Sequence, residues 1–300
     1  MAELVVKKRH VPWVIAVAWS PDGQRIVSAG WRDRAQVWDV ATGKTRVTHP
    51  QDGLRQVVWF PDGARIATAG VDRTIDIWDA ASGATLLEYN GHTAGVWAMA
   101  LSPDGTRIAS GGQDNMVQVW DTASGQTLLT YQEHTDWVFA VAWSPDGKYL
   151  ASAGDDRVVR VWDAATGASV CTYQGHAQNA RALGNPHRIE SIAWSPDGQR
   201  IVSCSYAWVQ VWEALTGKTL LTYRNKLDHR GPVAWSPDGT RVASSEGWPG
   251  VVQVWDPATG ETTDSHSGHT SHIFTLAWSP DGRSLASGGR DHTTQVWKVG

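Results

Sequence analysis

The chain consists of short runs of alternating apolar and polar residues, each closed by a turn-forming group. In one stretch, residues 138–143 alternate as a β-strand, residues 144–147 form a turn, and residues 149–153, 158–162 and 169–173 predict three further strands. Valine, isoleucine, threonine and aromatic residues fill these runs, whereas proline, aspartate and glycine separate them. The pattern predicts an all-β protein of short strands.

This four-strand unit recurs seven times along the chain. The tripeptide Pro-Asp-Gly begins at Pro21, Pro61, Pro103, Pro145, Pro196, Pro237 and Pro280. A tryptophan ends the third strand of each unit, at Trp38, Trp78, Trp120, Trp162, Trp212, Trp255 and Trp297. The repeat of about 42 residues lies in the range of four-stranded propeller blades. Seven such units predict a β-propeller with seven blades.

Two dipeptides recur at fixed places in the units. Trp-Asp ends the third strand at residues 38–39, 78–79, 120–121, 162–163 and 255–256, and Gly-His stands at 91–92, 175–176 and 268–269. With these motifs the chain resembles the WD40 repeat family over its whole length. The resemblance implies a seven-bladed WD40 β-propeller with four antiparallel strands per blade, which acts as a binding module and not as an enzyme.

The last unit ends after its third strand, and the first residues of the chain match the missing fourth one. Residues 4–10 align with outer strands such as residues 128–134. We therefore expect the N-terminal strand 4–10 to pair into the last blade and close the ring, which leaves no unpaired sheet edge there. Residues 1–300 are then one WD40 propeller domain without a linker.

Bulk properties narrow the function classes. The 300 residues are 41% hydrophobic with a net charge of -4, and the two cysteines, Cys171 and Cys204, both lie in predicted strands. No apolar run is long enough for a signal peptide or a membrane span. We expect a cytoplasmic, monomeric protein with reduced cysteines and no cofactor.

Serine, histidine and aspartate recur together in three units, which invites a catalytic-triad interpretation. The three sets are His92, Ser110 and Asp114; His134, Ser152 and Asp156; and His269, Ser287 and Asp291. One active site does not need three copies. The resemblance implies instead a buried hydrogen-bond chain from Asp through His and Ser to the strand tryptophan.

The other four blades depart from this set. Blade one has Arg32 at the Asp position, blade two lacks the His, blade five lacks the Asp, and blade six lacks both, with Lys226 at the His position. Because each intact network contributes several buried hydrogen bonds, we interpret these losses as stability given up for another purpose. They predict a binding footprint over blades five, six, one and two, interrupted only by blade seven.

Loop variation and surplus tryptophans favour the same face. The Ser-Pro-Asp-Gly and Trp-Asp turns, expected on the bottom face, vary little, whereas the loop before blade five is nine residues longer than its counterparts. Six tryptophans fall on top loops or at the top of inner strands: Trp13, Trp31, Trp97, Trp137, Trp208 and Trp248. Aromatic side chains dominate binding hot spots, so they predict a recognition surface. Trp97 and Phe139 are explained more simply as lining of the central funnel.

We therefore expect a protein or peptide ligand on the top face. The predicted partner-binding residues are Trp13, Trp31, Arg32, Arg55, Arg181, Leu183, His187, Arg188, Tyr206, Trp208, Lys226, His229, Arg230, Glu246 and Trp248. The excess of basic residues in the long loop and around Arg230 favours an acidic partner. The basic residues are too diffuse for nucleic acid, and no membrane partner is expected.

Other chemistries rank lower. A cage of Trp31, Tyr206, Trp208 or Trp248 would suit a methylated ammonium group, and His266, His269 and His272 recur at a spacing of three. An enzyme, metal or small-molecule site on the top loops would require His187, His229, Glu190 and Glu246 to converge. The uniform frame with unlike loops is compatible both with natural divergence and with engineering of a consensus scaffold.

Overall fold

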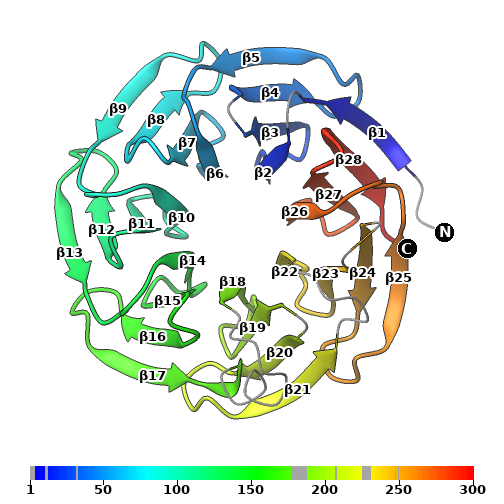
Figure 1. Ribbon diagram of the computed structural model, residues 1–300. Coiled ribbons are helices and arrows are strands. Elements are labelled where there is room, and N and C mark those ends of the chain that lie inside the picture. Colours follow the sequence, from blue (N-terminus) through cyan, green and yellow to red (C-terminus); the bar gives the residue numbers. More distant parts are fainter. Residues whose placement is uncertain are drawn as a thin grey trace.

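The computed structural model describes residues 4–10, 13–31, 33–176, 188–206, 208–224, 231–246, 248 and 250–300, apart from the side chain of Arg224. In this part of the chain, strands form seven four-stranded antiparallel sheets that stand around a ring (Figure 1). Sequence neighbours pair within every sheet, as short connections favour. The predicted all-β, seven-bladed propeller is confirmed.

The first three blades contain β2 (Val14–Trp19), β3 (Arg25–Gly30), β4 (Ala35–Asp39), β5 (Thr45–His49); β6 (Leu54–Trp59), β7 (Arg65–Gly70), β8 (Ile75–Asp79), β9 (Thr85–Tyr89); and β10 (Val96–Leu101), β11 (Arg107–Gly112), β12 (Val117–Asp121), β13 (Thr127–Tyr131). Blades four and five contain β14 (Val138–Trp143), β15 (Tyr149–Gly154), β16 (Val159–Asp163), β17 (Ser169–Tyr173); and β18 (Ile189–Trp194), β19 (Arg200–Ser205), β20 (Trp208–Glu213), β21 (Thr219–Arg224). Blades six and seven contain β22 (Val233–Trp235), β23 (Val242–Glu246), β24 (Val251–Trp255), β25 (Thr262–His266); and β26 (Ile273–Trp278), β27 (Ser284–Gly289), β28 (Thr293–Lys298) with β1 (Leu4–Arg9).

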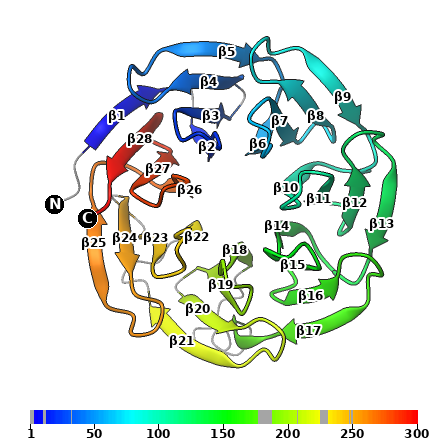
Figure 2. The same cartoon turned by 180° about the vertical axis from the view of Figure 1, so that it is seen from behind.

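The N-terminal strand closes the ring as predicted. β1 runs antiparallel to β28, with Arg9 opposite Thr293 and Leu4 opposite Trp297. Lys8 also reaches blade one, where its Nζ donates to the carbonyl of Gly43 at 3.0 Å. Figure 2 shows β1 outside β28, between β5 and β25 along the rim. The two ends of the chain therefore complete one sheet.

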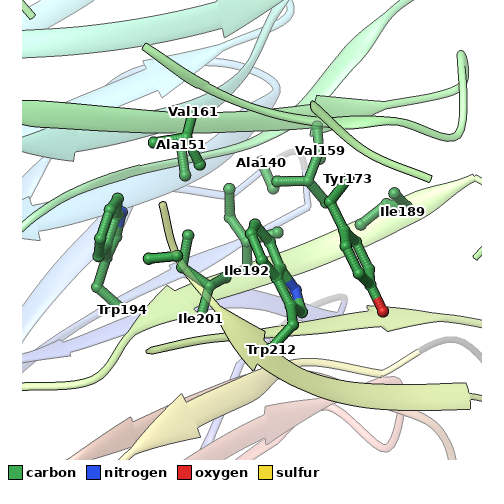
Figure 3. Packing of buried hydrophobic residues seen from close by; sticks show 12 residues of the cluster. Ala140, Ala151, Val159, Val161, Tyr173, Ile189, Ile192, Trp194, Ile201 and Trp212 are labelled. Atoms are coloured by element: carbon green, nitrogen blue, oxygen red, sulfur yellow. The ribbon is translucent and has the colours of Figure 1, made fainter. Parts of the chain in front are cut away.

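The core lies mainly between blades. The third-strand tryptophan of every blade is fully buried. An aromatic ring from the outer strand of the preceding blade stacks on most of these tryptophans. The ring centres of Tyr131 and Trp162 are 4.5 Å apart, and those of Tyr173 and Trp212 are 4.4 Å apart. Figure 3 shows the cluster between blades four and five, where Trp212 and Tyr173 pack with Ile192. Each blade is thus stabilised largely by its neighbour.

The repeated Ser-His-Asp sets are hydrogen-bond networks, as the resemblance implied. In blade four, the ring of His134 lies 2.8 Å from Asp156 and 2.7 Å from Ser152, whose hydroxyl also accepts from Trp162. Blades three and seven repeat the Asp-His-Ser part, with histidine–aspartate distances of 2.9 and 3.0 Å. Among the described residues, however, the indole nitrogens of Trp120 and Trp297 have no hydrogen-bond partner. In blades three and seven the hydrogen-bond network therefore ends at the serine.

Among the described residues, blade one has no aspartate within hydrogen-bond distance of its network histidine. Asp33, one residue beyond the expected position, brings a carboxylate oxygen to 3.6 Å from His10 Nδ1, and His10 Nε2 lies 2.7 Å from Ser28. The turn is as long as in blades three, four and seven, but the aspartate stands one position later in it, so its carboxylate remains beyond hydrogen-bond distance of His10.

In blades two and five, other polar groups take the places of the missing histidine and the missing aspartate. In blade two, Gln51 replaces the histidine and donates to Asp72 at 3.3 Å. In blade five, the buried His176 lies 2.8 Å from the hydroxyl of Ser205, with no aspartate at the usual place. Burial without a carboxylate lowers the pKa of His176 to about 3. Lys226 of blade six lies outside the described residues.

Candidate functional site

One β-bulge interrupts the inner strand of every blade except blade six. The register shifts between the first and third residues of the strand, as between Val14 and Ala16, so that one residue has no partner. A bulge re-aims the extra side chain. We call this the bulge position; it is occupied by Ile15, Arg55, Trp97, Phe139, Glu190 and Phe274.

Two further positions lie at the same end of each blade. The leading position is the residue before the inner strand, and the turn position follows the second strand. They are adjacent because the turn-position amide donates to the leading-position carbonyl: Trp31 to Trp13 at 2.7 Å, and Arg290 to His272 at 2.7 Å. The backbone thus holds these side chains near each other whatever their identity.

The three positions together build one cavity of about 700 Å³ at the top of the central funnel. Its walls are Trp13, Arg188 and His272 from leading positions, Trp31, Tyr206 and Arg290 from turn positions, and all six residues of the bulge position. No other described position contributes to the lining. A concave, largely aromatic cavity of this size is typical of a binding site.

Arg55 is the most enclosed cation in the cavity. Its guanidinium lies between two indoles, 3.7 Å from the ring centre of Trp31 and 3.6 Å from that of Trp97. Burial, and next the charge of Arg188, lower the pKa of Arg55 to about 10. The side chain therefore remains positively charged at neutral pH.

The other two arginines are also stacked on aromatic rings. Arg188 lies 4.1 Å from the ring centre of Phe139 and donates from Nε to Glu190 at 2.6 Å. Arg290 lies 4.9 Å from the ring centre of Trp13. Three cations and one carboxylate thus line the cavity, in a protein whose net charge is -4.

Blade six leaves a gap in this wall. Its inner strand β22 begins three residues late, at Val233, and Gly231 occupies the place of the bulge residue. A second cavity of about 280 Å³ adjoins the first, because the six bulge residues line both, and its wall also includes Gly231, Pro232 and Val233. The described residues of blade six therefore contribute to the second cavity and not to the first.

The structure brings together five of the predicted partner-binding residues: Trp13, Trp31, Arg55, Arg188 and Tyr206 line the cavity. Trp248 lies outside it, 61% exposed, with its ring 6.2 Å from that of His272. Trp208 begins β20 and is half-buried, and Glu246 is buried at the end of β23; neither lines the cavity. The remaining predictions lie outside the described residues: Arg32, Arg181, Leu183, His187, Lys226, His229 and Arg230.

The cavity differs in outline from the predicted footprint. Blades three, four and seven contribute Trp97, Phe139, His272, Phe274 and Arg290, whereas blade six contributes no lining residue. Sequence reasoning missed Arg290, although it occupies the same turn position as Trp31 and Tyr206. Alignment of the seven repeats column by column, without weighting towards aromatic residues, would have found it.

The geometry of the described residues does not favour the histidine metal site or the ammonium cage. His266 stacks on Trp297 and bonds to Gln295, whereas His269 belongs to the blade-seven network, so the two point to different partners. In the part of the chain that the structure describes, no three His, Cys, Asp or Glu side chains group as metal ligands do. One face of Trp31 is covered by the guanidinium of Arg55 and is not free for an ammonium group.

The comparisons with known proteins agree with the fold. A family model described as "WD domain, G-beta repeat" matches residues 3–39, 43–79, 83–121, 125–163, 167–213, 226–256 and 260–298. No sequence among the curated proteins matches the chain. None of the described residues belongs to a helix long and apolar enough to cross a membrane.

Proposed function

Because the chain belongs to the WD40 family, whose propellers are commonly non-catalytic scaffolds for protein interaction, we propose that it is a binding module for a protein or peptide on its top face. The cavity at the top of the funnel is the centre of the proposed surface. Trp208 and Trp248 lie beyond its lining, towards blades five and six.

One observation supports this proposal above all others. Among the described residues, the cavity is lined by the leading, turn and bulge positions alone. These positions vary between blades, and the turn position holds a different residue type in each blade where it is described. The frame around them repeats. Identical backbones that present unlike side chains to one concave surface are suited to recognition of an asymmetric ligand.

The surface also has the composition of a binding hot spot. Trp13 packs against Trp31 and Phe274, with ring centres 6.3 and 6.0 Å apart, so these rings are held rigidly while part of their area stays accessible. Rigid aromatic groups provide contact area at low entropic cost. Phe274 is 38% exposed, so part of this aromatic wall is accessible to a ligand.

A displayed library of random peptides, selected on the wild-type protein, provides ligands with which to test the proposal. We expect Trp31→Ala to weaken the selected peptides by about 30-fold or more, equivalent to the hot-spot threshold of about 2 kcal/mol. Trp208→Ala and Trp248→Ala extend the test beyond the cavity lining. Asp146→Lys and Asp197→Lys on the bottom turns are the controls, with melting curves to exclude unfolding. Loss of affinity in the controls, with the tryptophan variants silent, would place the site on the other face.

A further inference from the structure

The guanidinium of Arg55 lies between two aromatic rings, and among the described residues its in-plane N–H groups have no hydrogen-bond acceptor. Its Nε is buried, and none of the described residues accepts a hydrogen bond from it or forms an ion pair with it. Stacking on two indoles compensates part of the cost of burying the charge, because the ring faces attract cations. The donors that remain are the fork that recognises carboxylates and phosphates.

The charge balance of the cavity points to the same ligand chemistry. Arg188 already forms an ion pair with Glu190, whereas Arg55 and Arg290 have no carboxylate partner in the described part of the chain. Within the described part of the chain, two positive charges of the cavity therefore have no counter-charge. Arg188 also lowers the pKa of Arg55, so these two cations repel each other across the cavity.

Two of the three guanidinium groups are held in place before any ligand binds. Arg55 lies between Trp31 and Trp97, and Arg188 lies on Phe139 and is paired with Glu190. The third, Arg290, is exposed and lies over the ring of Trp13. A charged group that is already ordered loses less conformational entropy on binding than a free surface arginine. The aromatic rings thus act as supports for the cations and not as a cage for a positive ligand.

We propose that the cavity binds a group of the partner peptide that carries two negative charges, with Arg55, Arg188 and Arg290 as its cation set. This inference rests on the proposed function and adds to it the chemistry of the ligand. A phosphorylated side chain and a pair of adjacent aspartates both supply that charge in a volume that the cavity of about 700 Å³ accepts. All three arginines line this one cavity, so the proposed ligand is a single group and not an extended polyanion.

The test uses oriented peptide libraries that differ only in one fixed element: phosphoserine, Asp-Asp, unmodified serine or Lys-Lys, each within degenerate flanks. We expect the wild-type protein to bind the phosphoserine or Asp-Asp library at least about 10-fold more tightly than the serine library. The tighter of these two libraries identifies the source of the charge. Inorganic phosphate serves as a competitor and is expected to bind more weakly than either anionic library.

Matched variants locate the effect. Arg55→Gln and Arg290→Gln should each abolish most of the preference for the anionic library, whereas Arg107→Gln should not. Arg107 is the control because it also lies over an indole, 4.6 Å from the ring centre of Trp143, but on the bottom face. An equal loss in Arg107→Gln would overturn the proposal. So would a preference that persists in Arg55→Gln and Arg290→Gln.

Two outcomes separate this inference from the proposed function. If the four libraries bind equally well and Trp31→Ala weakens all of them, the top face is a binding surface but the anion site is wrong. If no library binds detectably, both proposals fail. If inorganic phosphate binds as tightly as the best library, the cavity is a free-anion site and the peptide part of the inference is overturned.

Discussion

The bottom of the ring repeats almost the same turn in each blade, whereas the top presents a different set of side chains in each. At the bottom, Ser144 accepts from the amide of Tyr149, and Asp146 accepts from Lys148; five other blades repeat the serine part. Gly147 ends this turn with φ +67°, a conformation that favours glycine, and its equivalents have nearly the same φ. The bottom turn therefore constrains the residue type itself.

The bottom also joins neighbouring blades. Trp143 donates from its indole to the carbonyl of Ala100 at 3.1 Å, and Arg107 of the same preceding blade lies over its ring. Trp19, Trp194 and Trp278 make the same bond to the preceding blade. These side chains hold the ring together, so substitution there is costly.

At the top, the β-bulge of each inner strand permits variation of the side chain. The bulge holds its residue through main-chain geometry alone, so that Arg55, Phe139 and Glu190 occupy equivalent places with unlike chemistry. The structure of the bottom turns thus depends on particular side chains. At the top, the backbone determines where a side chain lies but not which residue it belongs to. Specificity can therefore change at the top without loss of the fold.

The two ends of β14 offer the sharpest way to break this comparison. Trp143→Ala should destabilise the protein by about 3–5 kcal/mol, because it removes a buried indole and its bond to blade three. Trp137→Ala, just before the same strand, should cost under about 1 kcal/mol, because that ring is 38% exposed. Denaturant unfolding measures both. Equal costs would show that the top and bottom are not distinct in stability.

The hydrogen-bond networks give a smaller expected effect. His134→Ala should destabilise by about 1–3 kcal/mol, because it leaves Asp156 and Ser152 buried without the imidazole. Burial raises the pKa of Asp156, but His134, the charge of Arg160 and the amide of Val158 together keep that pKa below its usual value. Gln51→Ala in blade two should cost less, about 0.5–1.5 kcal/mol, since it removes only one neutral amide.

Thermal and denaturant melting of both variants, with peptide binding as a second readout, checks this difference. Neither substitution should alter peptide affinity, because neither residue lines the cavity. If His134→Ala abolished binding at an unchanged melting temperature, the network would be part of the site and not of the frame.

A further effect concerns the pH dependence of stability and separates blade five from blades three, four and seven. His176 has a folded pKa of about 3, below the unfolded value near 6.5, so the unfolded state binds the proton more readily between these values. Stability should therefore be highest above pH 6.5 and fall by roughly 1.4 kcal/mol per pH unit below it from this group alone.

The variant His176→Gln isolates this contribution. Free energies of unfolding measured between pH 4 and 7 should depend less steeply on pH in the variant, by about one proton. The slope is the readout, so a uniform loss of stability in the variant does not obscure it. Identical slopes would mean that the buried histidine does not titrate as inferred.

Much of the repeated β-structure could be predicted from the sequence, because the same pattern of strands and turns occurs seven times. Strand order, blade number and the pairing of residues 4–10 with the last blade followed from periodicity, turn residues and one missing strand. The buried role of the Ser-His-Asp sets followed from their repetition. Local propensity and the repeat agree in these features, so no distant contact was needed to decide them.

The site required the tertiary structure. The sequence marked Trp31 and Tyr206 as unusual but could not place Arg290 beside Trp13, because those residues are adjacent only once the ring has closed. Nor could it tell how closely Asp33 would approach His10, since the effect of a shift of one residue in a turn depends on the path of the backbone. The sequence by itself thus determined the repeated frame. The closed ring and its bulges decided which side chains share one cavity, because that depends on distances between blades and not on spacing along the chain.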